Sequence, residues 1–167
     1  MSFYFHGEEV TVPGTRPEVG SKMPDFTLLD KDGKSVSLQD LISDKPLLIS
    51  VVPDINTRVC SIQTKHFNEE VDGHESINFV TVSTNTSEQQ SEWCAAENVK
   101  NMKMLSDVNS DFGEAMNLIV PEKGIDLRSI WVVNTDGVIT YSEVLEEQTN
   151  EPNYTVVLDH IDEMYTN

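Results

Sequence analysis

Chemistry in this chain has to be argued from its two cysteines, Cys60 and Cys94. An unperturbed thiol has a pKa of about 8.5, so only a few per cent of it is thiolate at pH 7. A nucleophilic cysteine therefore needs a helix N-terminus, a neighbouring cation or hydrogen-bond donors. Cys60 is offered all three, because it lies in the first turn of an expected helix, close in sequence to the Thr57 hydroxyl and the Arg58 cation.

Arg128 is the second cation that could serve such a site. It is one of only three arginines, and it begins the apolar stretch LRSIWVV, where a charged residue is poorly suited unless it faces a polar site. The alternative also stays open that Cys60 is a small buried core residue and Arg128 a charge at a strand end. For cysteines in general, this is the commoner outcome.

Cys94 lies beside Trp93 on an expected amphipathic helix, where a cysteine usually just packs. It is nevertheless the only other cysteine, and a sulfenic acid becomes reversible when it condenses with a second thiol. Such a pair would form a disulfide between Cys60 and Cys94. Two cysteines on separate helices can pair only if their Cα atoms come within about 7 Å, which can require one helix to unwind.

The stretch from Leu48 to Phe67, with Leu47 just before it, must position Cys60. Residues 47–52 are mostly apolar and β-branched, which predicts a buried central strand, and Pro53 ends it because proline lacks the backbone donor. Asn56 and Thr57 suit a helix start. After them, apolar residues recur about every 3.6 residues, which predicts a helix. These residues are Val59, Ile62, Phe67 and Val71.

The rest of the pattern alternates strands and helices. Hairpins are expected where turn residues separate short β-prone stretches, and helices where apolar residues share one face. The expected hairpins pair Phe3–Phe5 with Val10–Val12, Phe26–Leu29 with Ser35–Leu38, and Arg128–Val133 with Val138–Ser142. Further strands are expected at 77–83 and 102–105. Helices are expected after Thr86, at 111–118 and from Pro152. The apolar face of the last helix consists of Tyr154, Val157, Leu158, Ile161 and Tyr165.

This order predicts a three-layer α/β fold with a mixed central sheet, compatible with a thioredoxin-like core. The length of 167 residues is ordinary for one domain. We expect a single domain over residues 1–167, in which residues 1–17 form an N-terminal hairpin extension.

Composition excludes several classes of function. The formal net charge is −18, so binding to nucleic acid, which is held mainly by Lys and Arg, is not expected. No apolar run approaches the roughly 20 residues that cross a bilayer, and the N-terminus has no basic flank, so we expect a soluble, cytoplasmic protein. The cysteines and histidines lack the spacing of metal ligands, so no metal site is expected.

The run PDINTRVC matches the PxxxTxxC active-site motif of the peroxiredoxins, with Pro53, Thr57 and Cys60 in register. The wider pattern resembles the bacterial thiol peroxidase branch, the atypical two-cysteine peroxiredoxins. It includes SVVPDINTRVCSIQTKHFNEE, EWCAAENV, MLSD, FGEA, RSIWVVNTDG, YSE and EPNY. The resemblance covers nearly the whole chain, so it is much stronger than one short motif.

This resemblance implies a role for each matched residue. Cys60 would be the peroxidatic cysteine and Cys94 the resolving cysteine of the same subunit. Thr57 would orient the peroxide and hydrogen-bond the thiolate, Arg128 would stabilise the thiolate and polarise the O–O bond, and Pro53 would shield the pocket. The resemblance also implies a thioredoxin fold with an N-terminal hairpin, reduction by thioredoxin, no metal or organic cofactor, and a homodimer.

The chain departs from the branch at three places. Arg58 stands where relatives often have a small residue or proline, and Leu127 stands where a small residue commonly precedes the strand arginine. The segment Asn85–Gln90 reads NTSEQQ, where relatives tend to have an apolar-aromatic segment, so we expect a wetter surface near Cys94. A second class of function stays open: a peroxide-sensing thiol switch that passes oxidation to a partner protein.

Overall fold

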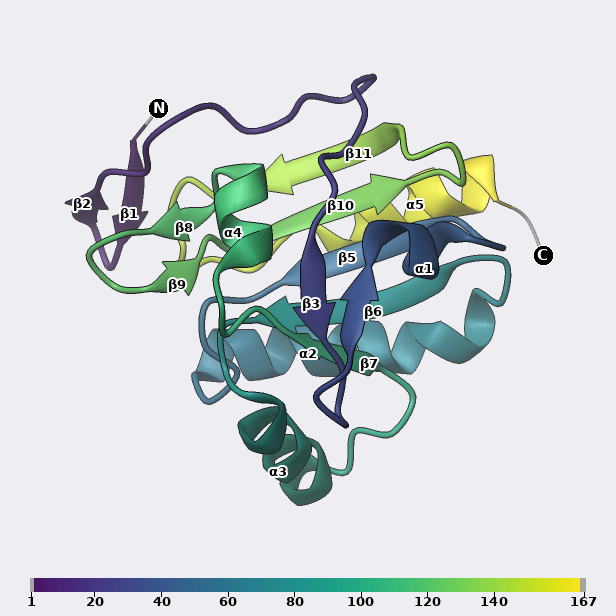
Figure 1. The fold of residues 1–167 in the computed structure, drawn as a ribbon, viewed down its shortest axis with the longest axis horizontal. Helices are drawn as coiled ribbons and strands as arrows, with labels where there is room; N and C mark the ends of the chain where they lie inside the picture. The colour runs from purple at the N-terminus through teal and green to yellow at the C-terminus, as the bar shows by residue number, and fades with distance from the viewer. Residues whose placement is uncertain (1, 166–167) are drawn as a thin grey trace.

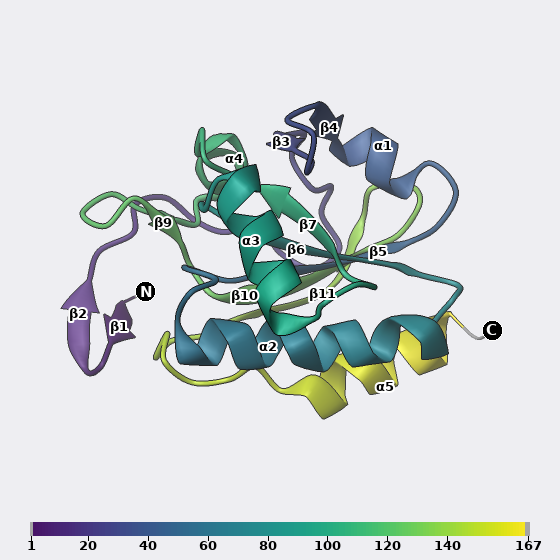
Figure 2. The same cartoon turned by 90° about the horizontal axis from the view of Figure 1, so that it is seen from below.

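The computed structural model describes residues 2–165, and its centre is a seven-stranded mixed sheet between two layers of helices (Figures 1 and 2). Strands β5, β6 and β7 are parallel, and the other neighbouring pairs are antiparallel. The mixed α/β fold expected from the sequence is therefore confirmed. In the spatial order of the sheet, the strands are β11 (Ile139–Val144), β10 (Ser129–Val133), β5 (Leu47–Val51), β6 (Asn78–Ser83), β7 (Lys103–Ser106), β3 (Thr27–Leu29) and β4 (Ser35–Ser37).

Helices cover both faces of this sheet. Figure 2 shows α2 (Arg58–Glu70) and α5 (Tyr154–Met164) side by side along one face, with α1 (Leu38–Ile42) and α4 (Asp111–Met116) on the other. Helix α3 (Ser87–Glu97) packs against β7. Among the described residues, none of the helices has the length and apolar character that a membrane crossing requires.

Strand β5 is apolar on both faces because each face is covered. Leu47, Ile49 and Val51 belong to the core cluster that includes α1 and α4, whereas Leu48 and Val52 belong to the cluster under α2 and α5. This alternation is what a strand's two-residue side-chain period requires. The central position predicted for this strand is confirmed by its pairing with β6 on one side and β10 on the other.

The N-terminal hairpin is present, with β1 (Phe3–Phe5) antiparallel to β2 (Glu8–Val10). The second strand begins earlier than the expected Val10–Val12, because the turn consists of only His6 and Gly7, both with positive φ. The last helix also differs from expectation. It begins at Tyr154 rather than Pro152, since the Asn153 side chain accepts from the backbone N–H of Val156 and caps the helix.

One helix and one short pair of strands were not expected from the sequence. Helix α1 follows β4 directly, because Ser37 and Asp40 form a capping box that ends the strand one residue early. The small pair β8 (Ile119–Val120) and β9 (Ile125–Asp126) has only two residues per strand, too few to show a periodic pattern.

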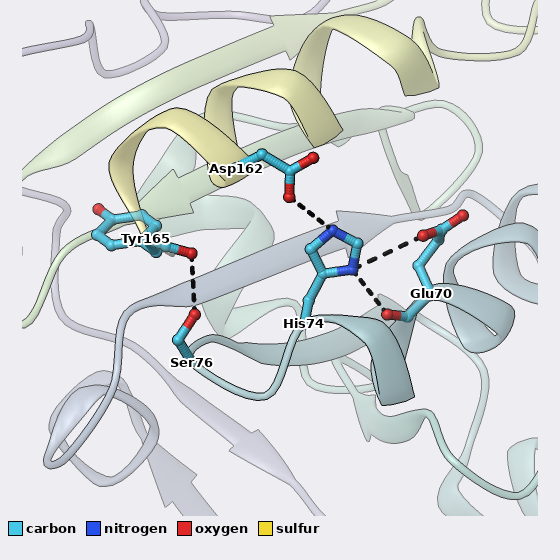
Figure 3. Close-up of polar contacts among 5 residues, drawn as sticks. All are labelled: Glu70, His74, Ser76, Asp162 and Tyr165. Atoms are coloured by element: carbon cyan, nitrogen blue, oxygen red, sulfur yellow. Dashed lines mark hydrogen bonds and ion pairs between the residues drawn. The ribbon is translucent and has the colours of Figure 1, made fainter. Parts of the chain in front are cut away.

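The C-terminal end of α2 is fastened to α5 (Figure 3). After the 3-10 turn η1 (Val71–Gly73), His74 Nδ1 lies 2.8 Å from the Glu70 carbonyl oxygen, and His74 Nε2 lies 3.1 Å from Asp162 Oδ1. Both groups are acceptors, so a protonated imidazole can donate to both. Nearby, Ser76 Oγ donates to the Tyr165 carbonyl oxygen at 3.0 Å. Helix α2 is thus held by several bonds at the end far from Cys60.

Two buried carboxyl groups lie between α4 and β9. Asp107 accepts hydrogen bonds from the backbone N–H groups of Phe112 and Gly113, each at 2.9 Å. Asp126 is completely buried, and neither of its oxygens meets an N–H or O–H donor among the described residues. It lies so close to Gly113 that a Cβ there would overlap Asp126 Oδ1. Burial raises the pKa of Asp107, and burial together with the neighbouring Asp107 carboxyl raises that of Asp126 well above its ordinary value.

Candidate active site

The loop between β5 and α2 sets the position of Cys60. Pro53 is buried directly after the strand, and the next residues form a turn in which the Thr57 N–H donates to the Asp54 carbonyl oxygen at 3.0 Å. Helix α2 then begins at Arg58, which places Cys60 in its first turn, as the sequence predicted. The first-turn N–H groups of a helix favour a nearby negative charge.

Asn85, in the bend between β6 and α3, holds this loop. Its Oδ1 accepts from the Ile55 N–H at 2.9 Å, and its Nδ2 donates to Asp54 Oδ1 at 3.0 Å. The polar segment Asn85–Gln90 was expected to make a wetter surface, and Thr86, Glu88 and Gln89 are indeed exposed, but the two ends of the segment bond inward. Gln90 is buried and donates to Ser83 Oγ and the Leu105 carbonyl oxygen, both at 2.9 Å.

Cys60 and Arg128 meet in the interior. The Cys60 side chain is fully buried, and Arg128 Nη2 donates to its Sγ at 3.3 Å. The rest of the guanidinium is fixed as well, because Nη1 donates to Gln63 Oε1 at 2.9 Å and Nε donates to the Gln148 carbonyl oxygen at 2.6 Å. Arg128 therefore does face a polar site, as its place at the start of an apolar strand suggested.

Two glutamines that the sequence analysis missed orient this arginine. Gln63 Nε2 donates to Ser50 Oγ at 2.8 Å and to the Val51 carbonyl oxygen at 3.3 Å, so its own oxygen must point toward Arg128. Gln148 accepts from the Arg128 backbone N–H through Oε1, and its Nε2 donates to the Leu145 carbonyl oxygen at 2.6 Å. Gln63 and Gln148 are both fully buried.

The charge of Arg128 has no anionic partner among residues 2–165, where its side chain donates only to the glutamine oxygens and to Cys60 Sγ. Arg128 is buried, and an unpaired buried charge is costly. A thiolate at Cys60 would neutralise this charge. The arrangement therefore suits an anionic sulfur held inside the protein.

The Thr57 hydroxyl uses its proton in another hydrogen bond. It donates to the Asp54 carbonyl oxygen at 2.9 Å and makes no capping bond to α2. Thr57 and the exposed Arg58 instead line an open pocket of about 740 Å³ between the start of α2 and α3, together with Glu92, Trp93 and Glu97. Because a hydroxyl has a single proton, Thr57 could donate to the sulfur only by giving up its bond to Asp54.

Cys94 is also separate from this contact. It is half-buried on α3, and burial raises the pKa of its thiol. It packs against the buried cluster that contains Cys60, but both cysteines are free thiols, and Cys94 lines a different pocket from Thr57. The structure thus brings together Cys60 and Arg128, and leaves the Cys94 thiol and the Thr57 hydroxyl apart from them.

Comparison with known proteins gives a consistent answer. The Redoxin family model matches residues 18–158. The chain is 42% identical to a thiol peroxidase of Listeria innocua over 156 residues, which cover 93% of this chain and 94% of the relative. It is 38% identical to a thiol peroxidase of Bacillus subtilis over 151 residues, 90% of each protein. The chain belongs to the Redoxin family.

Known structures of this family share the fold. A peroxiredoxin-like protein from Aquifex aeolicus superposes with a TM-score of 0.90 at 28% identity, covering 97% of this chain and 96% of that one. A thiol peroxidase from Chromobacterium violaceum gives a TM-score of 0.87 over the same shares, with 17% identity that speaks for the fold alone. The resemblance to the bacterial thiol peroxidases and the thioredoxin-like fold predicted from the sequence are confirmed.

Proposed function

We propose that this protein is a thiol peroxidase that reduces hydrogen peroxide and organic hydroperoxides through Cys60. The observation that carries the proposal is the buried hydrogen bond from Arg128 to Cys60 Sγ, at a guanidinium that forms no ion pair with a carboxylate among residues 2–165. In the first step, the Cys60 thiolate attacks one peroxide oxygen and the O–O bond breaks. The sulfur is oxidised to sulfenic acid, and the other oxygen takes a proton and leaves as water or an alcohol.

The neighbouring residues have separate parts in this step. The Arg128 guanidinium stabilises the thiolate and then the charge that develops on the breaking O–O bond. Pro53 is buried beside the site and shields it from solvent. Thr57 orients the peroxide after its hydroxyl turns from Asp54 toward Cys60. These roles agree with those that the family resemblance implies.

In the second step, the Cys94 thiol attacks the sulfenic sulfur, water leaves, and a disulfide joins Cys60 and Cys94. This step needs one helix to move, and α3 is the better candidate. Only Gln90 and Trp93 of α3 are buried, whereas α2 buries four residues and is tied to α5 through His74. Segments with few buried side chains open at lower cost.

Reduction of the disulfide returns Cys60 and Cys94 to thiols and completes the catalytic cycle. A dithiol reductant such as thioredoxin reduces the disulfide, which places the protein in a reducing compartment, the cytoplasm.

Residues 1–167 form one peroxiredoxin domain with residues 1–17 as an extension, and two chains form a homodimer. Sedimentation of the reduced and oxidised protein at several concentrations tests the dimer directly.

Trp93 offers a direct test of the cycle, because it lies beside Cys94 on the helix that moves, whereas Trp131 is fixed in the sheet. Mixing the reduced protein with hydrogen peroxide should give a fast, second-order fluorescence change and a mass loss of about 2 Da. Cys94→Ser should instead gain about 16 Da or more, because its sulfenic acid has no partner. Cys60→Ser serves as the blank.

Two outcomes would contradict this scheme. A wild-type rate no faster than that of a free thiol would leave Cys60 as a structural cysteine. A fast first turnover that stalls in the presence of thioredoxin, thioredoxin reductase and NADPH would favour the peroxide-sensing switch, because a sensor is recycled only through its own partner.

Gln148 should act as a positioning residue for Arg128. We expect Gln148→Met to slow the alkylation of Cys60 by iodoacetamide about 10-fold in a Cys94→Ser background. The Gln148 side chain fixes the Arg128 N–H and the Leu145 carbonyl oxygen, and so it holds in place the Gln148 backbone carbonyl oxygen that accepts from the guanidinium Nε. Gln90→Met is the matched control, since Gln90 is equally buried and also donates two hydrogen bonds. Both changes should destabilise the fold by about 1–3 kcal/mol. Equal slowing in both variants would mean that Gln148 has only a structural role.

A further inference from the structure

A second pocket opens on the other side of α3 from Thr57, with Cys94 in its wall. It has a volume of about 550 Å³ and lies between α3, the turn joining β3 to β4, and the chain leading into β7. Pockets that hold small molecules commonly have volumes of about 300–1,000 Å³. The Cys94 pocket is therefore large enough for a small organic ligand that reaches the thiol.

The lining of this pocket is unusually basic for this chain. The chain has only 11 Lys and Arg residues against 29 Asp and Glu residues. Three of those 11 line this pocket: Lys31, Lys100 and Lys103. None of the three forms an ion pair within residues 2–165. Two acidic residues, Asp30 and Asp32, also line it, and Asp30 Oδ1 already accepts from two backbone N–H groups. The lining thus has a net charge of +1, in a chain of net charge −18.

The three lysines would keep this charge in place during the catalytic cycle. Lys31 belongs to the turn between β3 and β4, Lys100 follows the end of α3, and Lys103 begins β7. None of them lies on α3 itself, so unwinding of that helix does not remove them. The pocket beside Thr57 differs, because it is lined by Glu92 and Glu97 with Arg58 as its one basic residue among the described residues.

We propose that the Cys94 pocket binds low-molecular-weight thiols that carry carboxylates, and that such a thiol reduces the disulfide by attacking Cys94. The inference rests on the proposed function for the existence of that disulfide. The thiolate forms a bond to Cys94 Sγ, the bond between the two cysteine sulfurs breaks, and Cys60 leaves as a thiolate. A second thiolate then attacks the ligand sulfur, which releases a small-molecule disulfide and a Cys94 thiolate that takes up a proton.

The two cysteines differ in a way that sets this direction of attack. Cys60 is fully buried and receives a hydrogen bond from Arg128, so it is shielded from an incoming thiol and is stabilised as the leaving group. Cys94 is half-buried at the pocket wall, and burial raises the pKa of its thiol, so it is the poorer leaving group and the more accessible sulfur.

The test compares mercaptosuccinate, which carries two carboxylates, with neutral 2-mercaptoethanol as reductants of the peroxide-oxidised protein. The pocket variant combines Lys31→Gln, Lys100→Gln and Lys103→Gln. The control variant combines Lys22→Gln, Lys45→Gln and Lys123→Gln, which changes the net charge equally at residues that do not line the pocket. We expect the ratio of the two reduction rates to fall about 3- to 10-fold in the pocket variant only. Added salt should lower the ratio in the wild type.

An equal fall in both variants, or no fall in either, would overturn the inference. A loss of about 2 Da must first show that the disulfide has formed; if it does not form, the proposed function fails. Binding then decides the inference separately. Calorimetry uses (methylthio)succinate, a thioether that cannot undergo thiol–disulfide exchange, with the reduced proteins. Its affinity should be about 3- to 10-fold lower for the pocket variant than for the wild type, as expected from the loss of three exposed charges, and unchanged for the control variant. Absence of binding to the reduced wild type would also overturn it.

Discussion

Replacing Arg128 with methionine should lower the second-order rate constant of Cys60 with hydrogen peroxide by about 100- to 1,000-fold. The guanidinium donates to the sulfur at 3.3 Å, and both side chains are buried. Removing one preorganised donor from such a site typically costs this much in rate. Stopped-flow fluorescence of Arg128→Met against the wild type measures the loss.

Arg58 provides the control for this change. It stands two residues before Cys60 but is exposed, so its charge is screened by solvent. We therefore expect Arg58→Met to change the rate less than about 3-fold. If Arg58→Met were as slow as Arg128→Met, the overall positive potential would matter rather than the directed donor. Arg128→Lys should recover only part of the rate, because an ammonium cannot bond Gln63, Gln148 and the sulfur in one plane.

The sequence was sufficient to predict residues whose role follows from local pattern. Pro53, Thr57 and Cys60 lie on one strand–loop–helix unit, and each position follows from propensity and capping. Arg128 was found differently, because a charge in an apolar strand has no good structural explanation. Its role at Cys60 was implied by the family resemblance, whereas the pairing of β10 with β5, which brings the two residues together, is seen in the structure alone.

The glutamines show where sequence reasoning stops. Gln63 had a usable signal, since it lies three residues after Cys60 and therefore on the same side of the helix. Gln148 had none, because it lies in an irregular segment after β11, and its contact with Arg128 depends on the path of that segment. The role of Asn85 was hidden for a similar reason: its partners, Ile55 and Asp54, are about 30 residues away in sequence.

The two pockets on either side of α3 differ in charge, so they favour different reactants. The pocket on the Thr57 side lies at the start of the helix that carries Cys60 and contains acidic residues, whereas the pocket on the Cys94 side has a net positive charge. A neutral peroxide and an anionic thiol would then approach the same helix from different sides. Because α3 buries few side chains, its movement can connect the two sides at low cost.

The second large effect should appear in stability and should depend on pH. The pKa values of Asp126 and Asp107 are raised in the folded protein, so the folded state keeps a proton that the unfolded state loses above about pH 4. The contribution of this pair to the free energy of unfolding therefore falls as the pH rises from about 4 toward the raised pKa. Asp126→Asn removes this titration, and its amide can donate to the Asp107 carboxylate. We expect it to be about 1–3 kcal/mol more stable than the wild type at pH 8, with the difference shrinking toward pH 4.

Urea unfolding at several pH values measures this difference, and Asp159→Asn is the necessary control. With a net charge of −18, removing any carboxylate relieves some repulsion and can stabilise the protein. Asp159 is exposed on α5, so its replacement reports that general effect alone. Equal stabilisation by the two variants would show that Asp126 is ionised at little cost despite its burial. A gain in the free energy of unfolding that is confined to Asp126→Asn and to the higher pH values would show instead that the two buried carboxyls share a proton in the wild type. That shared proton would help to hold α4 against β9, the strand that leads to Arg128.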